Sequence, residues 1–202
     1  MNKHLILHLE SLRPSIDVLG KWLVTCNSKT AQKGMMSTIL HSRQITHRRG
    51  SQNYERVWEQ VILPRIDDVL MFTFVRNPWD RVVSAFHFLQ QDRGKYKGNT
   101  FQEFVKRDLK ESGTEVDGHF RPQAPTFMCN GGLIPNMVVG RFERLQDDWT
   151  FIADKLGVKR ELPHLNESIH RPYPECYDDE CVEVVAKLYS EEIDALGYKF
   201  GQ

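Results

Sequence analysis

Residues 70–89 place the strongest constraint on the fold of this chain. LMFTFV (residues 70–75) is a continuous apolar run with the length and composition of a buried strand. Asn77 then follows as a candidate N-cap, Pro78 suits the first helical position, and Asp80 puts an acidic side chain in the first turn. The segment therefore predicts a strand, a tight turn and a helix that runs from residue 78 to about residue 89.

Strand and helix patterns alternate along the rest of the chain. Apolar runs predict further strands at residues 21–26 and 137–142, and helical patterns cover residues 34–41, 54–62, 101–109, 147–156 and 180–196. This order is typical of an α/β fold in which helices flank a central parallel sheet. With 202 residues, of which 40% are hydrophobic, we expect one domain over residues 1–202 with a core at about 21–200.

In such sheets, ligands bind beyond the carboxyl ends of the strands, and two polar turns occupy that position. The later turn carries Arg76 at the strand-to-helix junction and Ser84 two helical turns further on. A guanidinium beside the backbone N–H groups of a helix N-terminus can bind two phosphate oxygens at once. The alternative is that Arg76 and Arg81 simply pair with acidic neighbours.

The earlier turn follows Cys26 and reads NSKTAQKGMMS. It brings Lys29, Thr30, Lys33 and the backbone of Gly34 to a predicted helix N-terminus, where an anion is favoured. It lacks the G-x-x-x-x-G-K-[ST] pattern of a Walker A loop. Taken alone, this loop favours a solvated lysine turn over an anion site.

Bulk composition excludes several classes of function. Lys plus Arg and Asp plus Glu both number 27, so no global charge indicates nucleic acid or a membrane surface. The chain has no apolar run of about 18 residues, and its first residues do not read as a signal peptide. This predicts a protein without a membrane span that is cytoplasmic, unless a targeting segment has been removed. The four cysteines lack zinc-site spacing, so no metal site is expected; Cys176 and Cys181 are either free thiols or a short disulfide.

VRNPWDRVVSAF (residues 75–86) resembles the 3′-phosphate-binding motif of sulfotransferases that use PAPS (3′-phosphoadenosine 5′-phosphosulfate), above all the membrane-type carbohydrate group, family 2. The resemblance implies that Arg76 and Ser84 contact the 3′-phosphate. It also matches the earlier turn to the loop that binds the 5′-phosphosulfate, with Ser28 in place of the usual proline. The implied cofactor-binding residues there are Lys29, Thr30, Ala31, Gln32, Lys33, Gly34 and Met35.

Three further segments resemble the same family in the same order. DGHFRPQ (residues 117–123) is similar to its H-W-x-P-Q segment, with Phe120 in place of tryptophan. VGRFERLQDD (residues 139–148) and LYSEEIDALGYKF (residues 188–200) are similar to its G-[KR]-F-E-x-L-x-x-D turn and LYxxDIxxFGYxF terminus. Together the matches imply a P-loop-NTPase-like sulfotransferase fold over most of the chain.

The resemblance implies sulfuryl transfer from PAPS to an acceptor hydroxyl on a carbohydrate, with PAP as the product and no metal. Such an in-line displacement depends on positioning and charge neutralisation, which Lys29 would supply on the leaving side. The general base is assigned first to His119 and second to His41; His47 and Glu143 are further candidates. The residues expected to bind the acceptor are Arg121 and Gln123.

Two other functions remain open at this point. A sulfotransferase fold that binds nucleotide without turnover would account for the irregular loop at Lys29. A P-loop kinase would need a Walker A glycine pair and a Mg²⁺-binding aspartate after a strand, and the sequence has neither. The sulfated position and the oligomeric state are also left open.

Overall fold

The structure is a computed structural model that describes residues 15–17, 22–24, 46–47, 60, 64, 67–157, 161–162 and 171–202. The chain forms two compact units. Met1–Val75 with Pro125–Leu165 makes up one, here called the sheet unit, and Arg76–Ala124 with Asn166–Gln202 makes up the other, the helical unit. The assignment of residues 1–202 to one domain stays a prediction.

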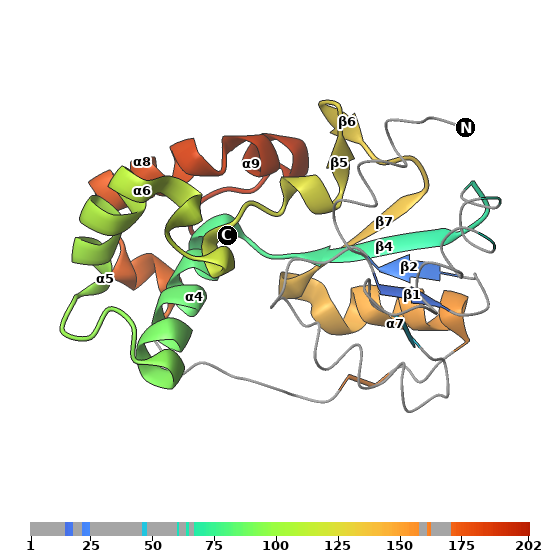
Figure 1. Cartoon of the computed structure of the whole chain (residues 1–202), viewed down its shortest axis with the longest axis horizontal. Coiled ribbons are helices and arrows are strands. Elements are labelled where there is room, and N and C mark those ends of the chain that lie inside the picture. The colour runs from blue at the N-terminus through green and yellow to red at the C-terminus, as the bar shows by residue number, and fades with distance from the viewer. Residues whose placement is uncertain are drawn as a thin grey trace. The chain divides into compact units, whose positions relative to one another are not determined.

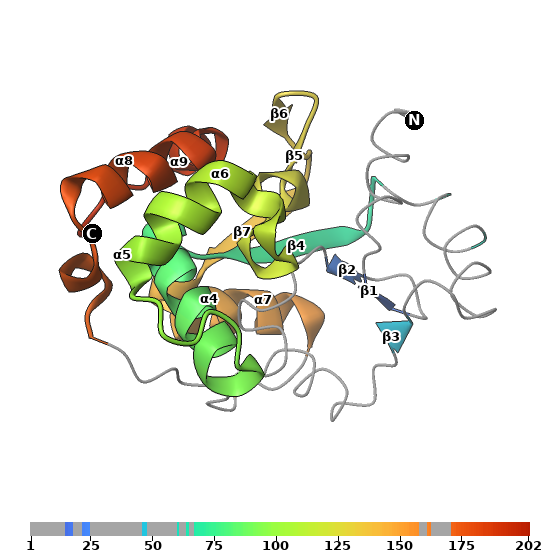
Figure 2. The same ribbon diagram turned by 60° about the vertical axis from the view of Figure 1, so that its left-hand side comes forward.

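Five of the described strands of the sheet unit form one mixed sheet with the order β3-β1-β2-β4-β7. Figure 1 labels β1, β2, β4 and β7 of this sheet, and Figure 2 labels β3. Strands β2, β4 and β7 run parallel, whereas β1 is antiparallel to both β2 and β3. The predicted α/β class with a central parallel sheet is therefore confirmed, and two short antiparallel strands extend it. The strands are β1 (Ser15–Asp17), β2 (Trp22–Val24), β3 (Thr46–His47), β4 (Leu70–Val75) and β7 (Met137–Arg141). A separate hairpin joins β5 (Met128–Cys129) to β6 (Gly132–Leu133).

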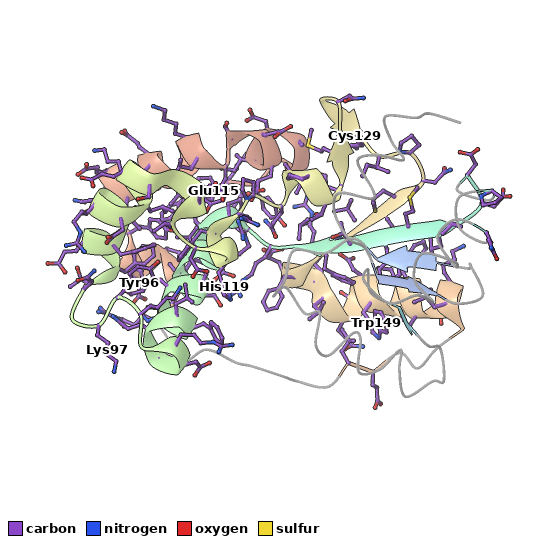
Figure 3. The ribbon with its side chains drawn as sticks, in the orientation of Figure 1. Tyr96, Lys97, Glu115, His119, Cys129 and Trp149 are labelled. Carbon is purple, nitrogen blue, oxygen red and sulfur yellow. The ribbon has the colours of Figure 1, made fainter. Side chains whose placement is uncertain are left out.

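Helix α7 (Leu145–Leu156) covers one face of this sheet and closes the core of the unit. Trp149 is fully buried against Phe72 and Phe74 of β4 (Figure 3). Gly140 stands opposite Phe74 in the β4–β7 register, and a Cβ there would lie 2.4 Å from Cε1 of that ring. Glycine is thus required because the phenylalanine ring fills the space above the strand.

The turn from β7 to α7 contains the 3₁₀ segment η7 (Phe142–Arg144). Asp148, in the first turn of α7, accepts a 2.7 Å hydrogen bond from the backbone N–H of Arg141 through Oδ2. The carboxylate thus ties the strand end to the helix start. This contact gives a structural reason for the aspartate in the segment 139–148.

The first helix of the helical unit, α4 (Pro78–Arg93), begins as its sequence predicts. Oδ1 of Asn77 accepts a 3.1 Å hydrogen bond from the N–H of Trp79, and Pro78 occupies the first helical position. The helix continues four residues past the predicted end and stops at Gly94, whose φ of 65° is left-handed.

The predicted helix at residues 101–109 is confirmed, although most of it has π-helical hydrogen bonding. Thr100 and Glu103 form a capping box at its start, because each side chain accepts a hydrogen bond from the backbone N–H of the other residue. The segment consists of α5 (Phe101–Glu103), η3 (Phe104–Leu109) and α6 (Lys110–Ser112). Short 3₁₀ turns follow at η4 (Gly113–Val116), η5 (Gly118–Phe120), η6 (Ala124–Thr126) and η8 (Tyr173–Cys176).

The prediction of one continuous helix over residues 180–196 is wrong. The structure has α8 (Asp179–Leu188) and α9 (Ser190–Leu196), divided at Tyr189. The buried Tyr189 hydroxyl donates a 2.6 Å hydrogen bond to the carbonyl of Phe120. That long-range bond fixes the side chain at the point where the helix breaks.

Aromatic side chains form the core of the helical unit. Phe86 of α4 packs against Phe104 and Phe101, with ring centroids 5.2 and 5.6 Å apart. Trp79 contacts Phe200 at 5.8 Å and donates its indole N–H to the carbonyl of Val182 at 3.1 Å. In consequence α4 packs on α8. Figure 2 labels both helices among those of the helical unit.

Candidate active site

Arg76 lies between the end of β4 and the start of α4, where the sequence predicts a phosphate clamp. Its Nε donates a 2.6 Å hydrogen bond to Oδ2 of Asp80, one helical turn away. The acidic pairing that we considered for Arg76 is therefore present. Because Asp80 sits in the first turn of α4, this contact keeps the guanidinium beside the positive end of the helix dipole.

The backbone of Arg76 is bound by the side chain of Gln123. The Arg76 N–H donates to Oε1 of Gln123 at 2.9 Å, and Nε2 of Gln123 donates to the Arg76 carbonyl at 2.9 Å. Gln123 is 1% exposed. One side-chain amide thus satisfies the backbone N–H and the backbone carbonyl of Arg76, as a neighbouring strand would.

Arg81 is buried, and its guanidinium contacts other groups of the helical unit. Its NH1 donates a 3.0 Å hydrogen bond to the carbonyl of His119, and its NH2 lies 3.8 Å from Oε1 of Glu192. Its guanidinium also stacks over the ring of Tyr189 at 5.2 Å. The acidic pairing considered for Arg81 is therefore also present, and it joins α4 to α9.

His119 forms a dyad with Asp117 at the start of η5 (Figure 3). Oδ1 of Asp117 accepts hydrogen bonds from both the ring Nδ1 and the backbone N–H of His119. This bond selects the tautomer in which Nε2 carries the lone pair. Nε2 is buried and has no hydrogen-bond partner among the residues that the structure describes.

Lys95 completes the group around Asp117, with Nζ 2.6 Å from Oδ2. Burial alone would raise the pKa of Asp117, but the hydrogen bonds from Lys95 and His119 outweigh burial and hold its pKa well below the ordinary value. Asp117 is therefore ionised at neutral pH and keeps His119 oriented. The hydrogen bond and charge of Asp117 in turn raise the pKa of Lys95.

The contacts described above involve residues of two motifs that the sequence marks, at residues 75–86 and 117–123. A fixed arginine at a strand-to-helix junction is followed by an Asp–His dyad and by a buried glutamine. Across the chain, the model of the family described as "Sulfotransferase family" matches residues 18–199. The chain belongs to the sulfotransferase family.

Two known proteins are similar to parts of this chain. An uncharacterized protein of Archaeoglobus fulgidus is 31% identical over 96 residues, which make up 48% of this chain and 74% of that protein. A sulfotransferase from Alicyclobacillus acidocaldarius, known from its crystal structure, aligns over 88% of this chain and 87% of its own, with 14% identity and a TM-score of 0.37. The family match supports sulfuryl transfer as the class of reaction.

The structure describes the segment that is predicted to bind the 3′-phosphate and not the one that is predicted to bind the 5′-phosphosulfate. Arg76, His119, Arg121 and Gln123 lie in the helical unit, as does Ser84, which is half-buried on α4. Lys29 and the loop 29–35 lie outside the described residues, and so does His41. Their proposed roles stay predictions.

The remaining candidates differ in exposure. Arg121 is 62% exposed and pairs with Glu115 at 3.1 Å, so it lies at the surface. Glu143 is exposed in η7 of the sheet unit. His47 belongs to β3, of which only the backbone is described.

Three further findings concern the described part of the chain. It contains no group of three His, Cys, Asp or Glu side chains that could hold a metal ion. No helix within these residues has both the length and the apolar character that a membrane crossing needs. Cys176 and Cys181 are free thiols.

Sequence reasoning missed the partners that hold His119 and Gln123 in place. The Asp-x-His spacing of Asp117 and His119 was a usable local signal for the dyad. No local sequence pattern marks Glu192 as a partner of Gln123, because the two residues are 69 positions apart. Long-range contacts of this kind have no local pattern.

Proposed function

We propose that this sulfotransferase transfers the sulfuryl group of PAPS to a hydroxyl of a carbohydrate acceptor. The observation that carries the proposal is the fixed position of Arg76 at the end of β4, in a segment that resembles the 3′-phosphate motif of PAPS-dependent enzymes. Asp80 holds its guanidinium and Gln123 holds its backbone. An arginine held in this way is suited to binding two oxygens of one phosphate.

On the donor side, Arg76 and Ser84 would bind the 3′-phosphate, and the N-terminus of α4 adds a favourable dipole. Lys29 and the loop 29–35 would bind the 5′-phosphosulfate. Positive charge from Lys29 would neutralise the bridging oxygen as the bond from sulfur to that oxygen breaks. Preorganised charge of this kind stabilises a transition state by about 3–4 kcal/mol.

On the acceptor side, His119 is the proposed general base. The acceptor oxygen forms a new bond to sulfur, its proton passes to Nε2 of His119, and PAP leaves with the electron pair of the broken bond. The Asp117 contact supports this role, because it places the proton of the neutral ring on Nδ1, leaves the lone pair on Nε2 and orients the ring. The exposed Arg121 is suited to contact an acidic acceptor, whereas the buried amide of Gln123 is engaged within the protein.

Binding of PAP tests the donor assignment directly. Isothermal titration calorimetry should show PAP binding to the wild-type chain, and Arg76→Ala should weaken it roughly 10- to 100-fold, as the loss of a charge-assisted hydrogen bond predicts. Arg107→Ala is the matched control, because Arg107 is exposed and pairs only locally with Asp108. A wild-type chain without affinity for PAP would contradict the proposal.

Turnover tests the acceptor and the base. The wild-type chain is incubated with PAPS and a panel of neutral and acidic saccharides, and sulfated products are identified by mass spectrometry. His119→Ala should retain PAP affinity and lose about 10²- to 10⁴-fold in turnover. PAP binding without transfer to any acceptor in the panel would instead favour a nucleotide-binding protein without turnover.

A further inference from the structure

Glu192 of α9 is a fully buried carboxylate with an unusual number of partners in the helical unit. Its Oε2 accepts hydrogen bonds from the backbone N–H groups of Gln123 and Ala124, the latter at 3.0 Å. Its Oε1 accepts a 3.1 Å hydrogen bond from Nε2 of Gln123 and lies 3.8 Å from NH2 of Arg81. A buried charge requires compensation of this kind to be tolerated.

Through these contacts Glu192 fixes both the backbone and the side chain of Gln123. The same side chain holds the N–H and the carbonyl of Arg76. An unbroken series of hydrogen bonds therefore runs from α9 to the residue that the proposed function assigns to the 3′-phosphate. The second branch of the network runs through Arg81 to the carbonyl of His119.

We propose that Gln123 and Glu192 are positioning residues of the donor site, with Glu192 holding Gln123 and Gln123 holding Arg76. The proposal rests on the proposed function, since it concerns how Arg76 meets the 3′-phosphate. It moves Gln123 from the acceptor side to the donor side.

The physical reason lies in the backbone of Arg76. Arg76 follows the last residue of β4, so the strand no longer fixes its peptide groups. A binding group must be held within about 0.5 Å and 10–20° to act productively, and a small rotation of the peptide is amplified along the arginine side chain. Two hydrogen bonds from one amide remove that rotation. Binding of the phosphate to the Arg76 side chain then does not have to order the Arg76 backbone as well.

The test compares two nucleotides that differ in the 3′-phosphate. Dissociation constants for PAP and for adenosine 5′-monophosphate are measured on the wild type and on Gln123→Met, which keeps the side-chain length and removes the amide. PAP binding should weaken about tenfold or more, and binding of the monophosphate should change by less than about twofold. A general loss of structure would weaken both nucleotides alike.

A matched control is available in α4. Nε2 of Gln90 also donates to backbone carbonyls, those of Tyr96 at 3.1 Å and Asn99 at 3.0 Å. Gln90→Met should keep the wild-type preference for PAP. Gln123→Asn serves as a second variant if Gln123→Met fails to fold, because its shortened amide cannot reach both groups of Arg76.

The outcomes separate this inference from the function on which it rests. Loss of the PAP preference in the Gln123 variants, with the preference kept in Gln90→Met, supports the inference. A wild-type preference that persists in both Gln123 variants overturns the inference and leaves the donor assignment intact. A wild type without preference for PAP overturns the donor assignment, and the inference with it.

Discussion

Replacement of Gly140 by alanine should destabilise the folded chain, because Gly140 faces a phenylalanine ring across the β4–β7 pair. The added Cβ would lie 2.4 Å from Cε1, 2.7 Å from Cδ1 and 2.9 Å from Cζ of Phe74. Carbon atoms attract one another best at about 3.5–4.0 Å, so the ring must move by about 1 Å. Phe74 is 2% exposed and packed beside Trp149, so its ring can move only by displacing core neighbours.

The expected magnitude is the balance of two effects. Overpacking of a core by one methyl group costs about 1–3 kcal/mol. Alanine is favoured over glycine within a strand by roughly 0.5–1 kcal/mol, because glycine loses more backbone freedom on folding. The difference of these two ranges is about 0–2.5 kcal/mol, and the close approach to the Phe74 ring places Gly140→Ala in its upper half. The free energy of unfolding should therefore fall by about 1–2.5 kcal/mol, and Tm should fall by about 2–10 °C.

Urea unfolding followed by tryptophan fluorescence measures this change. Gly132→Ala is the control: Gly132 is exposed in β6, and the nearest atom to its added Cβ is the carbonyl oxygen of Cys129 at 4.0 Å. Its effect should stay within about 0.5 kcal/mol. In Gly140→Ala combined with Phe74→Leu, the smaller side chain should accommodate the methyl group. The double variant should then lose less stability than the sum of the two single variants.

Two results would refute this reasoning. One is a Gly140→Ala chain as stable as the wild type, which would mean that the ring moves without cost. The other is strict additivity in the double variant, which would mean that Phe74 is not the group that the methyl meets.

Two further predictions concern charged groups of the helical unit. Because the folded-state pKa of Asp117 is lowered, its ionisation stabilises the fold above about pH 4, and this contribution is lost as the pH falls toward the folded-state pKa. The urea midpoints of wild type and Asp117→Asn should therefore converge below about pH 4, and a difference unchanged down to about pH 2 would contradict the assignment. Asp178 caps α8 by accepting a 3.0 Å hydrogen bond from the N–H of Cys181, so Asp178→Ala should lower the free energy of unfolding by about 1 kcal/mol in the same assay. Asp179→Ala, one residue further on, should change it by less.

Local chemistry was sufficient to predict the segment around Arg76. The apolar run of β4, the Asn77 cap and Pro78 act over a few residues, so their outcome can be read without knowledge of the rest of the chain. The strands β1 and β3 were missed because three and two residues carry no detectable alternation. The division of α8 from α9 was missed because Tyr189 is fixed by a carbonyl 69 residues away.

The candidate site was predictable to the same extent. Arg76 and His119 could be named from sequence because motifs mark them. Gln123 could be named, but its binding to the Arg76 backbone could not, since 47 residues separate the two. The pairing of Arg76 with Asp80 was foreseeable from the spacing of one helical turn.

The position of Glu192 also sets an order of events during synthesis. Ribosomes add about 5–20 residues per second, so the 69 residues between Gln123 and Glu192 take roughly 3–14 s to translate. During that interval Arg76 and Gln123 exist as polypeptide while the carboxylate that holds them does not. If Arg76 binds the 3′-phosphate as proposed, nucleotide bound early would meet a loosely held arginine, and the nascent chain would gain little from it until α9 has emerged and docked.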